Sequence, residues 1–159
     1  MLLKNALKYH GLKEVKGAQH NTTIVGMLNR LLATINDDET PWCSAYVNQV
    51  AHESGMETSD KLNARSWLNV GIPVQVNDAE PGDVVILWRG SPKSWKGHVG
   101  FYISHDQRYV TMLGGNQNNQ VGINKYDAKR ILGIRRLRPL PAVMPDINEK
   151  KESTGNTAG

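Results

Sequence analysis

The chain has 159 residues, enough for one domain with a hydrophobic core of its own. Hydrophobic residues make up 39% and charged residues 21%, which excludes a membrane bundle and a fully disordered chain. The net charge is +4, from 19 Lys and Arg residues and 15 Asp and Glu residues. The single cysteine, Cys43, excludes an internal disulfide framework and a multi-cysteine zinc site. Three interpretations of its thiol remain: an apolar core group, an unreactive thiol or a nucleophile.

Two helices are predicted before this cysteine. Apolar residues at helical spacing indicate a short helix over residues 2–12, ended by Gly11, and a second helix over residues 23–35. An acidic turn at residues 36–39 follows the second helix.

A third helix is expected to begin at Thr40 and Pro41, because Thr caps free backbone amides and Pro suits the first helical position. Gly55 is the expected end of this helix. The start places Cys43 in the first turn, at about the third helical position. One face of the helix carries Cys43, Val47, Val50, Ala51 and Ser54.

The second half of the chain, after a further short helix predicted over residues 63–70, has the pattern of strands. Residues 81–83 have the composition of a turn, and residues 89–97 that of a loop. Five strands are predicted, at residues 84–88, 98–103, 109–113, 121–124 and 131–135. Helices followed by an antiparallel sheet favour an α+β fold over a doubly wound α/β fold.

The two ends of the chain carry different signals. The first ten residues lack the apolar region and cleavage site of a secretory signal. No stretch approaches the roughly 18 consecutive apolar residues of a membrane span, so we expect synthesis in a cytoplasm and no membrane insertion. From Pro139 onward, prolines precede a polar stretch without aromatic residues. We therefore predict one domain over residues 1–138 and a disordered tail over residues 139–159.

The position of Cys43 favours a nucleophile. A thiol attacks as the thiolate, and a helix N-terminus lowers the pKa of a thiol through its free amides and its dipole. The apolar face that contains Cys43 should direct the thiol toward the sheet. A small buried core cysteine is the alternative, because cysteine is among the most buried residue types.

A nucleophilic thiol needs a base, and the chain has five candidate histidines: His10, His20, His52, His98 and His105. Only His98 begins a predicted strand. Its face of that strand carries Gly100 and Tyr102, and Gly100 leaves room for a neighbouring helix. His52 is expected at the surface, about two and a half helical turns from Cys43. A half-exposed strand histidine is the alternative for His98.

A base also needs an orienting partner, and the hairpin that follows His98 provides one. If the hairpin is centred near residue 106, His98 faces position 114, and Asn116 lies diagonally on the same face, within side-chain reach. Gln117 has the opposite parity and points away unless a bulge intervenes. An Asn can hold a His ring in one tautomer without adding charge. Geometry therefore predicts the constellation Cys43, His98 and Asn116.

Four segments together resemble the CHAP and NlpC-type cysteine peptidases and amidohydrolases, above all those of phage endolysins and bacterial cell-wall hydrolases. The segments are DETPWCSAYVN (38–48), PGDVV (81–85), GHVGFY (97–102) and LGGNQ (113–117). The resemblance extends from about Leu3 to Arg138. It implies a papain-like fold and hydrolysis of peptidoglycan amide bonds through a thioester, with the nucleophile at Cys43 and the base at His98. The third position matches Asn116, where related families also use Glu or Asp.

The resemblance also bears on ligands and partners. Some CHAP domains bind calcium, and Asp37, Asp38 and Glu39 are the candidates here, but a solvated acidic turn is favoured and no metal or other cofactor is expected. The expected substrate-binding residues are Trp42, Trp88, Trp95 and Gln117. For Trp88 a structural role at the end of a strand is an equal alternative.

Bacterial peptidoglycan is the expected partner, and the protein is expected to be a monomer. Five basic residues gather near the end of the domain: Lys129, Arg130, Arg135, Arg136 and Arg138. This charge suits an anionic cell envelope better than nucleic acid, because no aromatic residues alternate with it. The expected activity is that of an endopeptidase or an N-acetylmuramoyl-L-alanine amidase, reaching the wall through a separate pore or by injection. A non-catalytic module that binds the cell wall or nucleic acid is the alternative.

Overall fold

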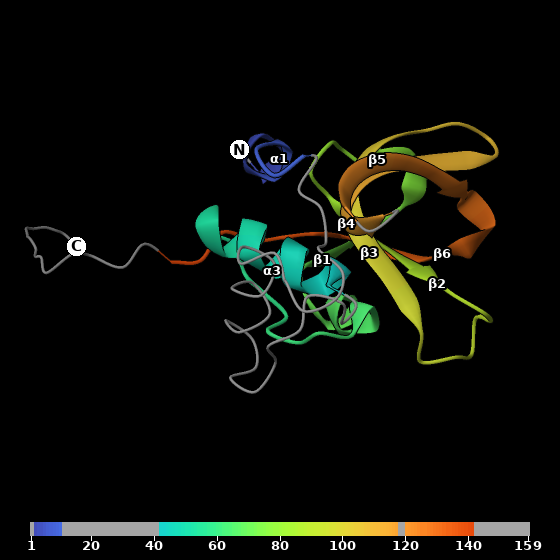
Figure 1. Ribbon diagram of the computed structural model, residues 1–159, viewed down its shortest axis with the longest axis horizontal. Helices are drawn as coiled ribbons and strands as arrows, with labels where there is room; N and C mark the ends of the chain where they lie inside the picture. The colour runs from blue at the N-terminus through green and yellow to red at the C-terminus, as the bar shows by residue number, and fades with distance from the viewer. Residues whose placement is uncertain (1, 11–41, 118–119, 142–159) are drawn as a thin grey trace, which may run out of the picture.

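The computed structural model describes residues 2–10, 42–117 and 120–141, with the side chains of residues 116 and 117 excepted (Figure 1). Its helices are α1 (Leu2–Leu7) and α3 (Cys43–Glu53), with shorter 3₁₀ helices at Ala64–Asn69 (η1), Val76–Asp78 (η2) and Ala128–Arg130 (η3). The predicted helix over residues 63–70 is confirmed as the 3₁₀ helix η1. The predicted helix over residues 23–35, the acidic turn and the Thr40–Pro41 start lie outside the described residues.

The strands form one antiparallel sheet in the order β1-β6-β2-β3-β4-β5. Their bounds are Ile72–Val74 (β1), Val84–Trp88 (β2), Gly97–His105 (β3), Tyr109–Gln117 (β4), Gln120–Asp127 (β5) and Ile131–Arg136 (β6). The α+β class is confirmed, and so are the five predicted strands. The sixth strand, β1, was not predicted. It has three residues, one of them Pro73, and pairs with β6 at the edge of the sheet, where a missing backbone donor is tolerated.

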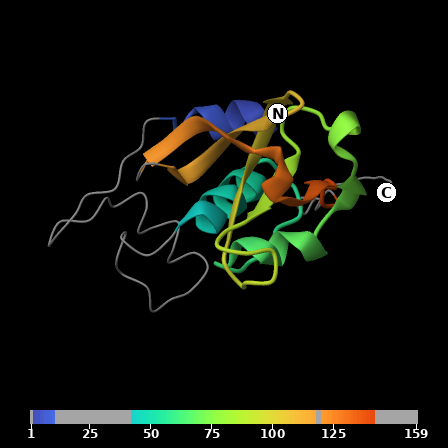
Figure 2. The ribbon, with the colours of Figure 1, turned by 90° about the vertical axis from the view of Figure 1, so that its right-hand side faces the viewer.

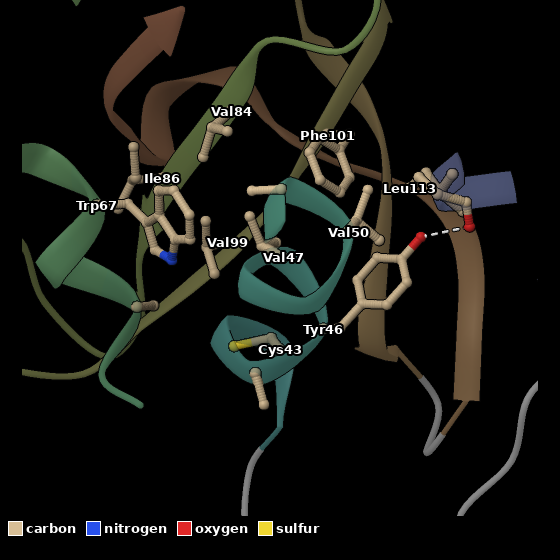
Figure 3. Packing of buried hydrophobic residues seen from close by; sticks show 14 of the residues in the cluster. Cys43, Tyr46, Val47, Val50, Trp67, Val84, Ile86, Val99, Phe101 and Leu113 are labelled. Carbon is tan, nitrogen blue, oxygen red and sulfur yellow. Dashed lines mark hydrogen bonds between the residues drawn. The ribbon is translucent and has the colours of Figure 1, made fainter. Parts of the chain in front are cut away.

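The sheet separates two hydrophobic clusters. Helix α3 covers one face, where Val84, Ile86, Val99 and Phe101 pack against its apolar residues (Figures 2 and 3). The opposite face carries a second cluster, formed by Val85, Leu87, Tyr102, Val110, Met112 and Ile134. Strict alternation along β2 and β3 sends neighbouring side chains to opposite clusters, as the period of a strand requires. The prediction that α3 packs on the sheet is therefore confirmed.

Helix α3 ends where predicted. The amide of Gly55 donates to the His52 carbonyl, and the amide of Met56 donates to the Ala51 carbonyl. These two bonds form a Schellman motif, which needs a left-handed residue, and Gly55 has a φ of 71°.

The beginning of α3 differs from the prediction. The helix starts at Cys43 itself, and Trp42 occupies the N-cap position, where its side chain does not cap the helix. Cys43 is thus the first helical residue and not the third. Its backbone amide is one of the helix-terminal N–H groups that have no partner within the helix.

The ends of the domain meet on α3. The Tyr46 hydroxyl donates to the Ala6 carbonyl at 2.7 Å, which fixes α1 against the helix. At the other end Leu140 donates its amide to the Gly55 carbonyl, and Pro139 forms an isolated bridge with Met56. The ordered contacts thus continue into the predicted tail as far as Leu140. No helix in the described part of the chain is long and apolar enough to cross a membrane.

Candidate active site

The thiol of Cys43 lies against the beginning of strand β3. The side chain is 5% exposed, and the backbone amides of Val99 and Ser44 donate hydrogen bonds toward Sγ. Figure 3 shows Cys43 at the first turn of α3, below the apolar side chains that continue along the helix toward the sheet. Val99 directly follows His98, so the nucleophile candidate touches the backbone next to the base candidate.

Burial dominates the acidity of this thiol. Desolvation raises the pKa of Cys43 above its ordinary value, and the amides of Val99 and Ser44 and the charge of Arg89 lower the pKa by less. The predicted net lowering by the helix terminus is therefore wrong. The resting group is a protonated thiol, and a base has to remove its proton during attack.

This burial predicts how the thiol titrates. We expect alkylation of native Cys43 by iodoacetamide to inflect at a higher pH than in the unfolded chain, where a cysteine titrates near pH ~8.5. Mass spectrometry can follow the adduct as the pH is raised from neutral to alkaline. Burial slows the reaction at every pH, so the inflection is the measure and not the absolute rate. An inflection below that of the unfolded chain would contradict the prediction.

His98 lies near the beginning of β3 and is 6% exposed. It pairs with Leu87 of β2, and paired residues share a face, so His98 belongs to the face of the second cluster and not to the face under α3. Gly100 was expected to leave room for a neighbouring helix, and this expectation is wrong. A Cβ at Gly100 would lie 2.9 Å from the Leu113 carbonyl oxygen, so β4 and not the helix takes up the space.

Tyr126 on β5 contacts the base candidate. Its ring lies 5.2 Å from the ring of His98, with an interplanar angle of 41°. Burial is the largest cause that raises the pKa of Tyr126, and a charge on Cys43 raises it further. The Tyr126 ring is therefore in contact with the imidazole, and its pKa responds to the charge of the thiol. The sequence did not single it out, because the predicted strand stopped at residue 124.

Arg130 completes this part of the site. Its guanidinium lies 5.5 Å from the centre of the Tyr126 ring and 5.9 Å from the centre of the Trp88 ring. Its Nε also donates to the Trp88 carbonyl at 3.0 Å. Trp88 is half-buried. The contacts give Trp88 a structural role beside the site, and they link β2, η3 and β5 around His98.

Asn116 occupies β4, and its side chain lies outside the described residues, as does that of Gln117. The register differs from the one expected. Phe101 pairs with Leu113, two residues further along β4 than the expected hairpin places it. The turn lies later than expected, since Ser104 pairs with Thr111, and a bulge between Tyr102 and Ser104 takes back one residue of that shift. The pairs between β3 and β4 end at Phe101 and Leu113, and β4 has a further irregularity between Gly114 and Gln117, so the role of Asn116 stays a prediction.

A pocket of about 210 Å³ opens at the thiol. It is lined by Cys43, Leu62, Asn63, Ala64, Arg89, Trp95, Lys96 and Gly97. Trp95 is 76% exposed, and its role in substrate binding stays a prediction. Trp42 is 0% exposed in the core, so it has no surface to offer to a substrate, and this prediction is corrected.

The other candidate residues are the remaining histidines and the acidic residues of the predicted turn. His52 is exposed on α3, as expected, and His10 is exposed beyond α1. His105 accepts or donates a 2.6 Å hydrogen bond with the Tyr102 hydroxyl and lies at the far end of β3. His20 and the acidic residues Asp37, Asp38 and Glu39 lie outside the described residues. Within the described ranges no three His, Cys, Asp or Glu residues come together as metal ligands.

Comparisons with known proteins agree with this geometry. The family model of the CHAP domain matches residues 35–116, a segment that contains Cys43, His98 and Asn116. No curated protein has a significant match to the chain. A Staphylococcus aureus protein described as similar to lipoprotein, of the NLP/P60 family, superposes with a TM-score of 0.52 at 18% identity. The match covers 85% of this chain but only 39% of that protein. The protein Ly7917 matches with a TM-score of 0.43 at 16% identity, over 87% of this chain and 61% of its own.

Proposed function

Because the chain belongs to the CHAP domain family, we propose that it is a cysteine-dependent hydrolase of peptidoglycan amide bonds. Membership of this family supports a cell-wall hydrolase type of function. The bond is in the stem peptide, for an endopeptidase, or between N-acetylmuramic acid and L-alanine, for an amidase. The finer part of the proposal is an endolysin-like role in the lysis of a bacterial host.

One observation carries the proposal. The only cysteine of the chain starts a helix, lines a pocket and accepts a hydrogen bond from the residue that follows His98. A buried cysteine with a purely structural role needs no opening to solvent.

The proposed reaction uses Cys43 as the nucleophile and His98 as the base. Sγ of Cys43 attacks the carbonyl carbon of the amide while His98 takes the thiol proton. The tetrahedral oxyanion lies at the start of α3, where the backbone amide of Cys43 can donate to it. The C–N bond then breaks, and His98 returns the proton to the leaving amine. Water attacks the thioester, His98 accepts its proton, and the free acid and the thiol are released.

Thiol alkylation tests the proposal directly, because a single adduct can form only at Cys43. We expect the protein to reduce the turbidity of permeabilised bacterial cells, and the loss of turbidity to cease in proportion to the adduct. Mass spectrometry measures the adduct and identifies the released fragments. A new amino group within the stem peptide indicates an endopeptidase, and a free lactyl carboxylate with an L-alanine amino terminus indicates an amidase. Full lysis by the completely alkylated protein would rule out catalysis by Cys43, and no lysis by the unmodified protein would support the non-catalytic module instead.

A further inference from the structure

Two segments that carry positive but no negative side chains contribute the walls of the pocket at Cys43. Residues 61–77 and 84–105 contain no Asp and no Glu. They carry five cationic side chains: Lys61, Arg65, Arg89, Lys93 and Lys96. A cleft lined by one sign of charge concentrates ligands of the opposite sign.

Arg65 is engaged within the protein. Its guanidinium donates to the carbonyl oxygens of Lys96, Pro92 and Ser91, at 2.8, 2.9 and 3.1 Å. These bonds hold the loop between β2 and β3 in place beside the pocket. Arg65 therefore gives the loop its shape, with three of its five N–H donors bound to backbone carbonyls.

Arg89 is different. It follows β2, it is exposed, and it lines the same pocket as Cys43. No carboxylate within residues 2–10, 42–117 and 120–141 forms an ion pair with it. Its positive charge lowers the pKa of the Cys43 thiol, whereas burial raises that pKa. A planar guanidinium without an acidic partner suits two-point binding of a carboxylate.

The rest of the pocket matches a carboxylate on an aliphatic chain. Lys96 adds a second positive charge to the wall. Leu62 and Ala64 provide an apolar surface, and the exposed ring of Trp95 can cover the methylene groups of a ligand. An acidic peptide has both features, and a neutral glycan has neither.

We propose that Arg89 binds a free carboxylate of the substrate next to the scissile amide, so that the enzyme selects acidic stem peptides over their amidated forms. This inference rests on the proposed function, because it concerns the substrate of the same site. Arg89 acts as a specificity-determining residue, and Lys96 and Trp95 complete the subsite.

Two muropeptides that differ in one group test the inference. One carries a free α-carboxylate on its isoglutamyl residue, and the other carries a carboxamide there. We expect the wild-type protein to prefer the carboxylate about tenfold in kcat/KM, through KM, as a charge-assisted hydrogen bond allows. Arg89→Gln should remove this preference, and Arg89→Lys should keep part of it. The ratio of the two substrates cancels any change in the reactivity of Cys43.

Lys93→Gln is the matched control, because it removes a charge from the same loop but does not line the pocket. It should keep the full preference. An unchanged preference in Arg89→Gln, or no preference in the wild type, would overturn the inference. If the wild type hydrolyses neither muropeptide, the proposed function fails. Calorimetry then measures the dissociation constants of the two muropeptides, and their ratio decides the role of Arg89.

Discussion

Cys43→Ala is expected to abolish the lysis of purified cell walls, with a loss of at least about a thousandfold in kcat. The chain has no second thiol that could form the acyl intermediate. The substitution removes one buried atom next to the Val99 amide, so the cost in stability should be modest, on the order of 1 kcal/mol. Turbidity measures the activity, and circular dichroism with thermal unfolding confirms the fold.

Companion variants separate chemistry from structure. Cys43→Ser keeps the shape of the side chain and should be as inactive as Cys43→Ala, because a hydroxyl is a poorer nucleophile in this buried position. His98→Ala should also be inactive, and adding it to Cys43→Ala should cost nothing further. His52→Ala is the matched control, an exposed histidine on the same helix as Cys43, and should keep full activity. A folded Cys43→Ala protein with undiminished activity would end the assignment.

Local sequence signals predicted most elements of the fold. The turn at residues 81–83 precedes a strand whose observed bounds, Val84–Trp88, are those predicted. Gly55 ended α3 as expected, because the helix needed a left-handed residue there. Strand β1 escaped the prediction because a three-residue edge strand with a proline has no alternating pattern. The position of an edge strand depends on its partner, β6, which lies about sixty residues away.

The register of the hairpin after His98 could not be predicted from local sequence patterns. A regular hairpin centred at residue 106 would pair position 98 with position 114. The observed turn lies later, so Ser104 pairs with Thr111, and the bulge between Tyr102 and Ser104 takes back one residue, which leaves Phe101 paired two residues further along β4 than expected. A shift by two preserves parity, so the faces of β4 up to Leu113 are those predicted, whereas a further irregularity lies between Gly114 and Gln117. No residue in the segment signals the bulge.

The sequence singled out a candidate nucleophile and a candidate base, but less of their surroundings. Helical spacing placed Cys43 on the buried face, but the net direction of its pKa depends on burial, which spacing does not measure. Trp42 precedes the nucleophile in sequence and still belongs to the core. Tyr126 reaches His98 because β5 and η3 return toward the beginning of β3, a result of the tertiary fold. Sequence patterns singled out the candidate groups, and the tertiary fold determined what surrounds them.

The support of the nucleophile depends on one glycine of β4. A Cβ at Gly115 would lie 2.7 Å from the Trp42 ring and 2.8 Å from the Tyr46 Cβ. Both aromatic side chains are 0% exposed, and the Tyr46 hydroxyl is bound to the Ala6 carbonyl. Neither can move aside without disturbing the core. We therefore expect Gly115→Ala to destabilise the protein by about 2 kcal/mol, or about 6 °C in Tm.

Gly122→Ala is the matched control, because Gly122 lies on the neighbouring strand β5 and a Cβ there would meet nothing closer than 3.9 Å. Its effect should stay within about 0.5 kcal/mol. Urea and thermal unfolding of both variants measure the difference. Trp42 directly precedes Cys43, so Gly115→Ala should also displace the start of α3 and reduce the rate of wall hydrolysis. Equal stability of the two variants would show that α3 is not held by this contact, and the rigid placement of the thiol would then need another cause.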